Sequence, residues 1–320
     1  MTRVVFMGTP EFAVPSLEAL AEAGAYEIVG VFTQPDRPAG RGKKLTACPV
    51  KRRALALGLP VFQFEKLRLP EGVAQLKALE PDVVVTAAFG QILTQELLDI
   101  PKKGTVNVHA SLLPAYRGSA PINWCILNGE TESGVTIMLT DRGIDTGDML
   151  RSRSTPIGEL ETAGELTERL SKIGAELLAE TLPEYLAGRL ERVPQDPEKA
   201  SYQPMLDKAM GIIDWTKPAR AIACQVRGLN PWPCACTDMA DGRLKIYLAK
   251  PIETDSQAEP GTVIASGPRE GLIVRCGEGA LEIVEMQAPG GKRMSARAYL
   301  MGKKIETGTR LGGNTTDEPR

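Results

Sequence analysis

The stretch Thr105-Val-Asn-Val-His109, continued by Ala110-Ser-Leu-Leu-Pro114, has the pattern of a β-strand that ends in polar side chains. Side chains two positions apart lie on the same face of a strand, so Asn107 and His109 should point together from its end. His109 is the only histidine among 320 residues and is therefore the one obvious group that could titrate near neutral pH. A hydrogen-bonded core histidine is the commoner alternative for such a residue.

Short apolar strands alternate with helical stretches on both sides of this run. Such alternation predicts an α/β fold, a Rossmann-like parallel sheet with helices on both faces. Ligands of such folds bind at the carboxyl ends of the strands, where Asn107 and His109 are expected. Gly8-Thr9-Pro10 lacks the Gly-x-Gly-x-x-Gly pattern, which argues against a nicotinamide cofactor. The expected strands are 3–8, 27–33, 59–64, 82–88, 105–110, 134–139 and 149–157, and the expected helices are 11–23, 50–57, 70–79, 120–129 and 161–189.

The residues after about 190 have a different composition. Residues 193–200 are rich in proline and polar residues, as in a linker. One helix at 218–227 is followed by short strands at 244–249, 261–265, 272–276 and 281–286, which predicts a small β-barrel. We therefore expect a catalytic domain over 1–189, a linker over 190–207, a C-terminal barrel over 208–307 and a disordered tail over 308–320.

The overall composition is that of an ordinary globular protein, with 42% hydrophobic and 24% charged residues. The sequence contains neither a run of about 18 apolar residues nor an N-terminal signal peptide, so we expect no membrane association. The six cysteines are scattered without a Cys-x-x-Cys pair, and one histidine cannot complete a zinc set. This pattern predicts reduced thiols, a cytoplasmic location and no metal site.

A strongly basic stretch lies near the N-terminus, although the net charge is −2. Prolines and glycines in its first half predict a flexible surface loop. A mobile cationic loop suits a phosphate backbone, whereas a merely solvated loop is the other interpretation. Between residues 37 and 53 there are seven basic residues and no acidic one: Arg37, Arg41, Lys43, Lys44, Lys51, Arg52 and Arg53.

A second polar cluster, Thr140-Asp141-Arg-Gly-Ile-Asp145-Thr-Gly-Asp148, follows the strand expected at 134–139. Its spacing is not that of an EF-hand calcium loop, and a plain turn is possible. Taken with Asn107 and His109, the cluster supplies a carboxylate from a neighbouring loop. An amide, an imidazole and a carboxylate together can handle developing charge and move a proton.

Several segments resemble the folate-dependent formyltransferases, over nearly the whole chain and more loosely beyond Lys245. The resemblance implies transfer of a formyl group from 10-formyltetrahydrofolate to the α-amine of methionine esterified to initiator tRNA, with Asn107, His109 and Asp145 as catalytic residues. The matching segments are Met7-Gly-Thr-Pro-Glu-Phe12, Asn107-Val-His109, Ser111-Leu-Leu-Pro-Ala-Tyr-Arg117-Gly118, Asp141-Arg-Gly-Ile-Asp145-Thr-Gly, Ile213-Asp-Trp215 and Leu229-Asn-Pro-Trp-Pro233.

The resemblance also implies where both substrates bind. A slot for the pterin would lie between residues 89–92 and the loop 141–145, with residues 111–114 at its mouth; an ordinary turn is the alternative for 89–92. The basic loop would contact the tRNA acceptor stem, and an OB-type barrel would extend the RNA contact. The implied folate-binding residues are Phe89, Gly90, Gln91, Ile92, Ser111, Leu112, Leu113, Pro114 and Asp141, and the implied tRNA-binding residues are Arg37, Arg41, Lys43 and Lys44.

The chain departs from the family pattern between Tyr202 and Asp214, where relatives often carry lysines and only Lys208 is present here. This makes a tRNA contact by the linker doubtful. We expect a monomer with no metal, and direct transfer without a covalent enzyme intermediate, because no cysteine lies in a nucleophile motif.

Three other activities are compatible with the sequence. One is formyl transfer to a small amine, a ribonucleotide or a sugar nucleotide; another is hydrolysis of the same folate to formate. The third is a non-catalytic RNA-binding protein. The basic loop and the region beyond Ala200 argue against a small acceptor, and the complete catalytic trio argues against a protein without activity.

Overall fold

The computed structural model describes residues 1–39, 42 and 44–312. Two of the predicted tRNA-binding residues, Arg41 and Lys43, lie outside the described residues. The chain forms two compact units, the first made of residues 1–121, 133–155 and 167–203 and the second of residues 122–132, 156–166 and 204 onward. Residues 190–203, predicted as part of a linker, thus belong by their contacts to the first unit. The exact domain boundaries stay a prediction.

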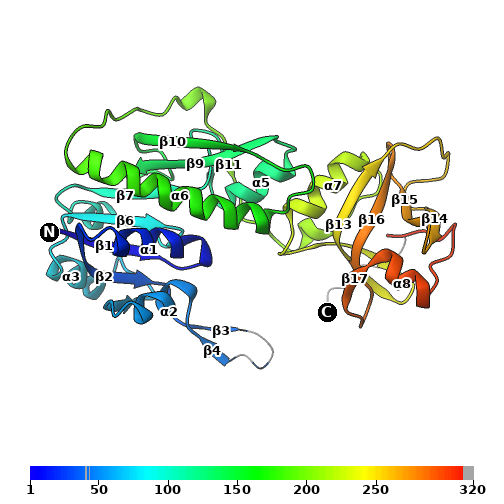
Figure 1. Cartoon of the computed structure of the whole chain (residues 1–320), viewed down its shortest axis with the longest axis horizontal. Coiled ribbons are helices and arrows are strands. Elements are labelled where there is room, and N and C mark those ends of the chain that lie inside the picture. Colours follow the sequence, from blue (N-terminus) through cyan, green and yellow to red (C-terminus); the bar gives the residue numbers. More distant parts are fainter. Residues whose placement is uncertain (40–41, 43, 313–320) are drawn as a thin grey trace. The chain divides into compact units, whose positions relative to one another are not determined.

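The first unit is built on a seven-stranded sheet with the order β10-β9-β7-β6-β1-β2-β5 (Figure 1). From the neighbouring strands β1 and β6 the chain continues outward in opposite directions, to β2 and β5 on one side and to β7, β9 and β10 on the other. Folds of this kind bind ligands where the strand order changes direction in this way. The carboxyl ends of β1, β6 and β7 therefore meet at one edge. The strands are β1 (Thr2–Gly8), β2 (Tyr26–Thr33), β5 (Val61–Gln63), β6 (Val83–Ala87), β7 (Thr105–His109), β9 (Glu132–Leu139) and β10 (Met149–Pro156).

The sheet is mixed, which corrects the prediction of a purely parallel one. β7 pairs in parallel with β6 but antiparallel with β9, where His109 lies opposite Thr136. A parallel β9 would need a connection that returns the chain to the amino edge of the sheet. Residues 110–120 instead form loops around the two-residue strand β8 (Arg117–Gly118), and the seven residues of α5 (Pro121–Leu127) span only about 10 Å at 1.5 Å per residue, so β9 starts near the edge where β7 ends.

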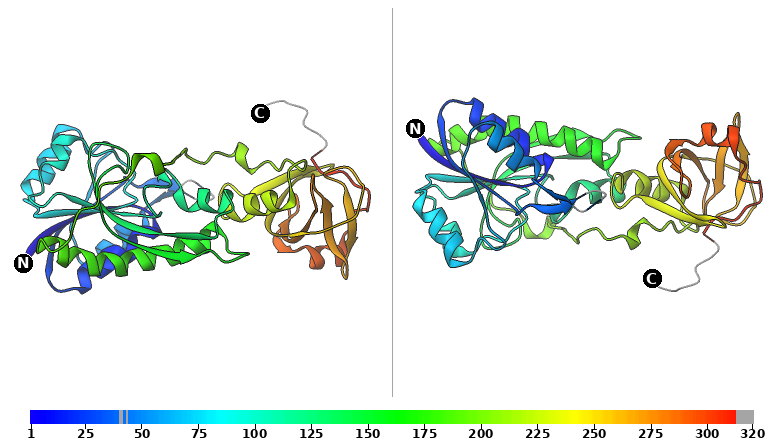
Figure 2. Two further views of the ribbon diagram at one scale, coloured as in Figure 1. Left: turned by 90° about the horizontal axis from the view of Figure 1, so that it is seen from above. Right: turned by 90° about the horizontal axis from the view of Figure 1, so that it is seen from below.

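Helices lie on both faces of the sheet, with α1 and α6 on one face and α3 on the other (Figure 2). Proline in the first turn of α2 and α3 matches the fixed φ that a helix start requires. α6 starts with a capping box, in which Thr162 and Glu165 accept each other's backbone N–H. The helices are α1 (Val14–Glu22, after the 3-10 turn Glu11–Ala13), α2 (Pro49–Ala56), α3 (Pro70–Ala78), α4 (Gln95–Leu98) and α6 (Ala163–Leu186).

The central strands are buried on both faces, as expected for a sheet covered by helices. Val4, Val5 and Phe6 of β1 have no exposed surface, and Val83 to Val85 of β6 are at most 1% exposed. This core holds the strand ends rigidly, so side chains projecting from them are fixed in position.

The basic stretch is partly a β-hairpin, which corrects the prediction of a flexible loop. Strands β3 (Arg37–Ala39) and β4 (Lys44–Thr46) pair antiparallel, with Arg37 opposite Thr46 and Pro38 opposite Leu45. Backbone pairing therefore fixes the base of this segment despite its prolines and glycines.

The second unit contains a six-stranded antiparallel sheet of order β12-β13-β16-β15-β14, with β17 paired to β16. Its core includes Trp215, Ile222 of α7, Leu244 and Leu300 of α8. The elements are α7 (Ala219–Gly228), β12 (Ala235–Met239), β13 (Gly242–Ile252), β14 (Val263–Gly267), β15 (Gly271–Arg275), β16 (Ala280–Gln287), β17 (Arg293–Ser295) and α8 (Ala296–Gly302).

The start of the predicted disordered tail is packed. Leu311 is 2% exposed, and its N–H donates to the Gly261 carbonyl at 2.8 Å. An apolar side chain within a polar stretch and this backbone bond anchor residues 308–312. Among the described residues, no helix has both the length and the apolar character that a membrane crossing requires.

Candidate functional site

His109 lies at the carboxyl end of β7 and is 6% exposed. Its Nε2 lies 3.1 Å from the carbonyl oxygen of Tyr116, and its Nδ1 lies 3.6 Å from Oδ2 of Asp145. The ring is therefore buried, as the core alternative required, but both its nitrogens face acceptors rather than apolar atoms.

Asn107 lies two residues earlier on the same strand and is only partly buried. Its Oδ1 accepts a hydrogen bond from the Thr86 hydroxyl of β6 at 2.8 Å. An amide with its oxygen fixed in this way turns its NH₂ group to the other side. None of the hydrogen bonds found among the described residues uses that NH₂ group, so it can donate to a ligand.

Asp145 belongs to the loop 140–148 between β9 and β10. Its backbone has φ of +52°, an uncommon conformation for a residue other than glycine. The Gly118 N–H donates to Oδ2 at 2.9 Å, the same oxygen that faces His109. The structure therefore brings Asp145 and His109 together, with Gly118 as a third group on the shared oxygen.

Asp141 has a local role in this loop. Its Oδ1 accepts hydrogen bonds from the Gly143 N–H at 3.0 Å and the Thr146 hydroxyl at 2.6 Å. Asp141, predicted to bind folate, thus shapes the loop that carries Asp145, and the residue is exposed.

The segment 111–114 is bound mainly to the protein itself. The Ser111 hydroxyl donates to the Ala115 carbonyl at 2.7 Å, and the Thr136 hydroxyl donates to the Ser111 carbonyl at 2.7 Å. Ser111 and Leu113 are 2% and 7% exposed, whereas Leu112 and Pro114 are half-buried. Of these four predicted folate-binding residues, only the last two present partly accessible side chains.

The segment 89–92 follows β6 at the same edge. The Phe89 ring is packed in the core, and the Gln91 amide is bound to Phe64 and Leu67 of a neighbouring loop at 2.7 Å each. The Gly90 carbonyl accepts from Gln34 at 2.9 Å, and the Ile92 side chain is 73% exposed. The side chains of Phe89 and Gln91 therefore stabilise the loop, which leaves Ile92 and the backbone for contact with a ligand.

Acidic residues from other elements neutralise much of the basic stretch. Lys51 is paired with Asp36 at 2.7 Å and lowers the pKa of that carboxyl group by hydrogen bonding. Arg37, a predicted tRNA contact, is paired with Glu65 at 2.6 Å. Arg52 and Arg53 are paired with Glu11 and Glu18. Among the described residues of the stretch, Lys44 is exposed on β4 and lies in none of the ion pairs found.

Three residues that surround His109 and Asn107 were not predicted from the sequence. The Thr86 hydroxyl orients an amide, the Tyr116 carbonyl contacts an imidazole, and the Gly118 N–H binds a carboxylate. Two of them act through backbone atoms, for which side-chain identity gives little signal. Thr86, a polar residue near the end of an otherwise apolar strand, was the one signal available.

None of the six cysteines, all of which lie among the described residues, forms a disulfide bond, and burial raises the pKa of the Cys276 thiol to about 12. Burial also raises the pKa of Cys234 and Cys236, which makes these thiols poor nucleophiles. Within the part of the chain that the structure describes, no group of histidine, cysteine or acidic residues is arranged to hold a metal ion.

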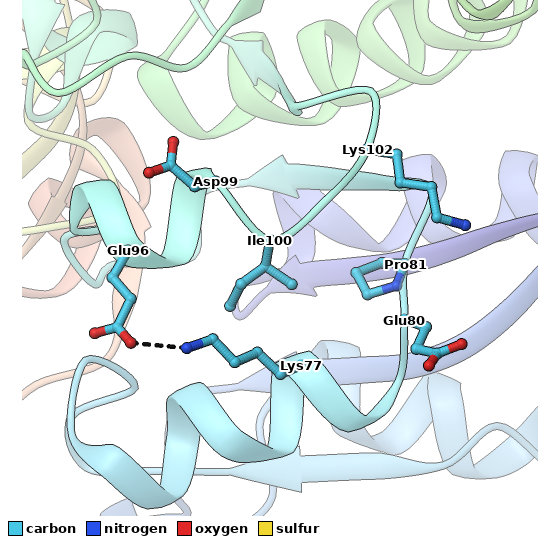
Figure 3. A pocket seen from close by; sticks show the side chains of 7 residues that line it. All are labelled: Lys77, Glu80, Pro81, Glu96, Asp99, Ile100 and Lys102. Carbon is cyan, nitrogen blue, oxygen red and sulfur yellow. Dashed lines mark hydrogen bonds and ion pairs between the residues drawn. The ribbon is translucent and has the colours of Figure 1, made fainter.

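A cavity of about 540 Å³ lies at the opposite, amino edge of the sheet (Figure 3). It is shallow and lined mainly by exposed charged side chains, among them the Lys77–Glu96 ion pair at 2.9 Å. Its position before β6 and β7 separates it from the group around His109 by the length of these strands.

Comparison with known proteins gives the following matches. Residues 2–182 match the family model described as "Formyl transferase", and residues 205–304 match "Formyl transferase, C-terminal domain". The methionyl-tRNA formyltransferase of Geobacter sulfurreducens is 51% identical over 311 residues, which cover 97% of this chain and 96% of the relative. That of Bacillus subtilis is 50% identical over 315 residues, or 98% and 99% of the two chains.

Solved structures show a similar fold at lower identity. An N-formyltransferase from Helicobacter canadensis, in complex with folinic acid and dTDP-3-aminofucose, has a TM-score of 0.63 at 20% identity, covering 88% of this chain and 98% of that one. HypX from Aquifex aeolicus with tetrahydrofolic acid has a TM-score of 0.60 at 17% identity, covering 96% and 50%. These similarities concern the fold alone.

Proposed function

This chain belongs to the formyl transferase family, and we propose that it transfers the formyl group of 10-formyltetrahydrofolate to the α-amino group of methionine on initiator tRNA. The observation that carries the proposal is the contact of His109 with Asp145 at 3.6 Å beside the oriented amide of Asn107. Relatives named methionyl-tRNA formyltransferases, about half identical over nearly the full length, support this choice of acceptor.

The reaction begins when the methionine amine attacks the formyl carbon. A C–N bond forms, and the formyl oxygen becomes negative in a tetrahedral intermediate. Hydrogen-bond donors fixed at the position of that oxygen stabilise the intermediate without reorganisation. The free NH₂ group of Asn107 is one such donor, and His109 supplies a neighbouring positive charge.

Asp145 has two tasks in this scheme. Its carboxylate, 3.6 Å from Nδ1, stabilises the positive charge that His109 carries in the reaction. It also accepts the proton that the amine loses, directly or through one water molecule. The intermediate collapses when the bond between the carbon and N10 of the folate breaks, and N10 takes up the proton that Asp145 accepted, directly or through water.

The binding sites for the two substrates are part of the proposal. The pterin would lie between residues 89–92 and 141–145, where the backbone, Ile92 and the partly accessible Leu112 and Pro114 can contact it. The β3–β4 hairpin, with Lys44, would contact tRNA phosphates together with Arg37, Arg41 and Lys43. We also propose that the sheet of the second unit forms an OB-like barrel that binds RNA, and that the protein is a cytoplasmic monomer.

The test is formyl transfer with 10-formyltetrahydrofolate to initiator tRNA charged with methionine. Free methionine and glycinamide ribonucleotide serve as acceptor controls, and released formate is measured in parallel. We expect formylmethionyl-tRNA as the product, with little transfer to either small acceptor. Formylation of the ribonucleotide, formate alone, or tRNA binding without transfer would each contradict the proposal in favour of a different activity.

A further inference from the structure

The segment 193–203 lies between the two regions that match formyl transferase models, 2–182 and 205–304. By composition it is a linker, yet it belongs to the first unit and contacts both loops around His109. From these contacts we propose that Gln195 is a positioning residue, which holds the Asp145 loop in place and is itself oriented by Arg117. This inference rests on the proposed roles of His109 and Asp145.

The Gln195 side chain bridges two elements of the site. Its Nε2 donates to the backbone carbonyls of Asp145 and Gly147, at 2.8 Å each. Its Oε1 accepts from Nε and Nη2 of Arg117, at 2.9 and 2.8 Å. We call these four hydrogen bonds the Gln195 brace.

The direction of the Gln195 amide is fixed by its partners. A guanidinium group has only donors, so the side of the amide that faces Arg117 must be the oxygen. The NH₂ group then faces two carbonyl oxygens, which only accept. A flipped amide would lose all four bonds, and a glutamate at this position could satisfy Arg117 but not the two carbonyls.

Arg117 is buried, with 5% of its surface exposed. Besides Gln195, it donates to the Tyr202 hydroxyl at 2.9 Å and lies over the Tyr202 ring. The buried guanidinium group is hydrogen-bonded to a neutral acceptor on each side. If it moved away from either acceptor, its N–H groups would be buried without a hydrogen-bond partner, which is costly, so the group is held rigidly. It therefore provides a firm anchor for Gln195.

The Asp145 loop needs such an anchor. Its φ of +52° is unfavourable for a side chain with Cβ, so bonds from outside the loop must maintain it. Within the loop, Gly147 approaches the Leu139 carbonyl so closely that a Cβ would clash with it. The brace ties the carbonyls of residues 145 and 147 and so sets the direction of the carboxylate between them.

The same segment holds the other side of the carboxylate. Tyr202 and Gln203 form strand β11 (Tyr202–Gln203), which pairs in parallel with β8 (Arg117–Gly118). The Ser201 hydroxyl accepts from the Tyr116 N–H at 2.8 Å. The Gln195 side chain, the Ser201 hydroxyl and the backbone of β11 thus position Asp145, the Gly118 N–H that binds it, and the Tyr116 carbonyl at His109.

The test compares Gln195→Met with Gln203→Met. Both variants replace a partly buried glutamine of the same segment by an apolar side chain of similar length, but only the first removes the brace. A displacement of about 1 Å at a reacting group lowers the rate about 100-fold. We expect Gln195→Met to lower kcat about 100-fold with KM for folate and tRNA within about threefold, and Gln203→Met to stay within about twofold of wild type.

A second measurement does not depend on formyl transfer. Because His109 is the only histidine, ¹⁵N labelling of histidine in tag-free protein gives the signals of one ring. Gln195→Met and Gln195→Glu should shift both ring ¹⁵N resonances, whereas Gln203→Met should not. Unchanged resonances in both Gln195 variants would contradict the positioning role of Gln195, even if the proposed reaction is correct. Shifted resonances would support that role, even if the acceptor proves to be different.

The kinetic constants distinguish a positioning role of Gln195 from direct contact with a substrate. A rise in KM with kcat unchanged would show that Gln195 contacts a substrate, and would overturn the proposal. Loss of the folded circular dichroism spectrum in Gln195→Met would move the test to Gln195→Glu, which keeps the Arg117 contact. Full kcat in folded Gln195→Glu would also overturn it.

Discussion

The two edges of the sheet in the first unit differ in how their charged groups are held. At the amino edge, the cavity in Figure 3 is lined by exposed lysines and acidic residues, of which Lys77 and Glu96 form an ion pair. At the carboxyl edge, His109 is 6% exposed and faces two acceptors, and the Asp145 carboxylate is oriented by Gly118. The amino edge therefore has a cavity and an exposed ion pair, whereas the carboxyl edge has buried polar groups whose orientation is fixed by hydrogen bonds.

This difference shows why cavity volume alone does not identify the site. Ion pairs between exposed side chains contribute little and are screened by water and salt. Buried groups with fixed partners act in a lower dielectric, where the same charges have larger effects on a reacting atom. We therefore expect substitutions at the carboxyl edge to change the rate and those at the amino edge to change stability only.

The largest effect is expected for His109→Asn. The variant keeps a polar side chain but removes the imidazole that supplies positive charge beside the formyl oxygen, so kcat should fall about 1,000-fold, the upper end of the loss when one group that stabilises an oxyanion is removed. Binding of the folate, measured by calorimetry with a non-reactive analogue, should stay within about threefold. A variant with more than a tenth of the wild-type rate would show that the chemistry does not use this ring.

A smaller effect is expected for Thr86→Val, which removes the hydroxyl that orients Asn107. The amide remains but loses its fixed direction, so kcat should fall about tenfold, less than complete loss of an oxyanion donor would cost. Thr140→Val is the matched control, because the buried Thr140 hydroxyl has no hydrogen-bond partner among the described residues. Equal rates in the two variants would mean that the Thr86 bond has no role in catalysis.

The same comparison shows which features were predictable from sequence. The strands of the first sheet were predicted within about two residues, because runs such as 83–85 are continuously apolar and strands of this kind are buried on both faces. The direction of β9 was not predictable in this way, since a periodicity of two is the same for parallel and antiparallel strands. The short strands β3, β4, β8 and β11 were missed because two or three residues carry no periodic signal.

At the site, the strand pattern predicted correctly that Asn107 and His109 share a face, and motif resemblance added Asp145. The residues that orient these groups were harder to find. Gly118 and Tyr116 act through the backbone, and Gln195 lies 50 positions from Asp145 in a segment with the composition of a linker. Such contacts depend on how loops approach each other, which local sequence does not encode.

A third prediction concerns Lys44 on the β3–β4 hairpin, which is exposed, unlike the buried His109. Lys44→Ala should weaken tRNA binding a few-fold and reduce the slope of log K against log salt by about 0.7 to 0.9 if the lysine contacts one phosphate. The measurement is a binding titration at several salt concentrations, with kcat at saturating tRNA expected to stay within about twofold. An unchanged slope would remove Lys44 from the tRNA interface. Lys51→Ala is the control, because Lys51 is already paired with Asp36.

The smallest effect on activity is expected at the amino edge, for Asp82→Asn. Asp82 accepts from Lys102 and from the Arg3 N–H at 2.8 Å each, and these bonds lower its pKa from the ordinary 3.8, with Lys102 the larger cause. A lowered pKa means that the carboxylate stabilises the fold above pH 3.8 and that this contribution is lost as the pH falls below it. At pH 7 the variant should lose about 1 kcal/mol of unfolding free energy.

This loss should shrink toward zero in acid, and kcat should stay within about twofold of wild type. Unfolding of the first unit is best followed by circular dichroism, because Trp124, Trp215 and Trp232 all belong to the second unit. A large loss of kcat in a stable Asp82→Asn protein would break the division between the two edges. It would mean that a structural change at the amino ends of β1, β6 and β7 reaches His109 at the carboxyl edge. We do not expect this, because these strands are buried and tightly packed, which should keep them rigid.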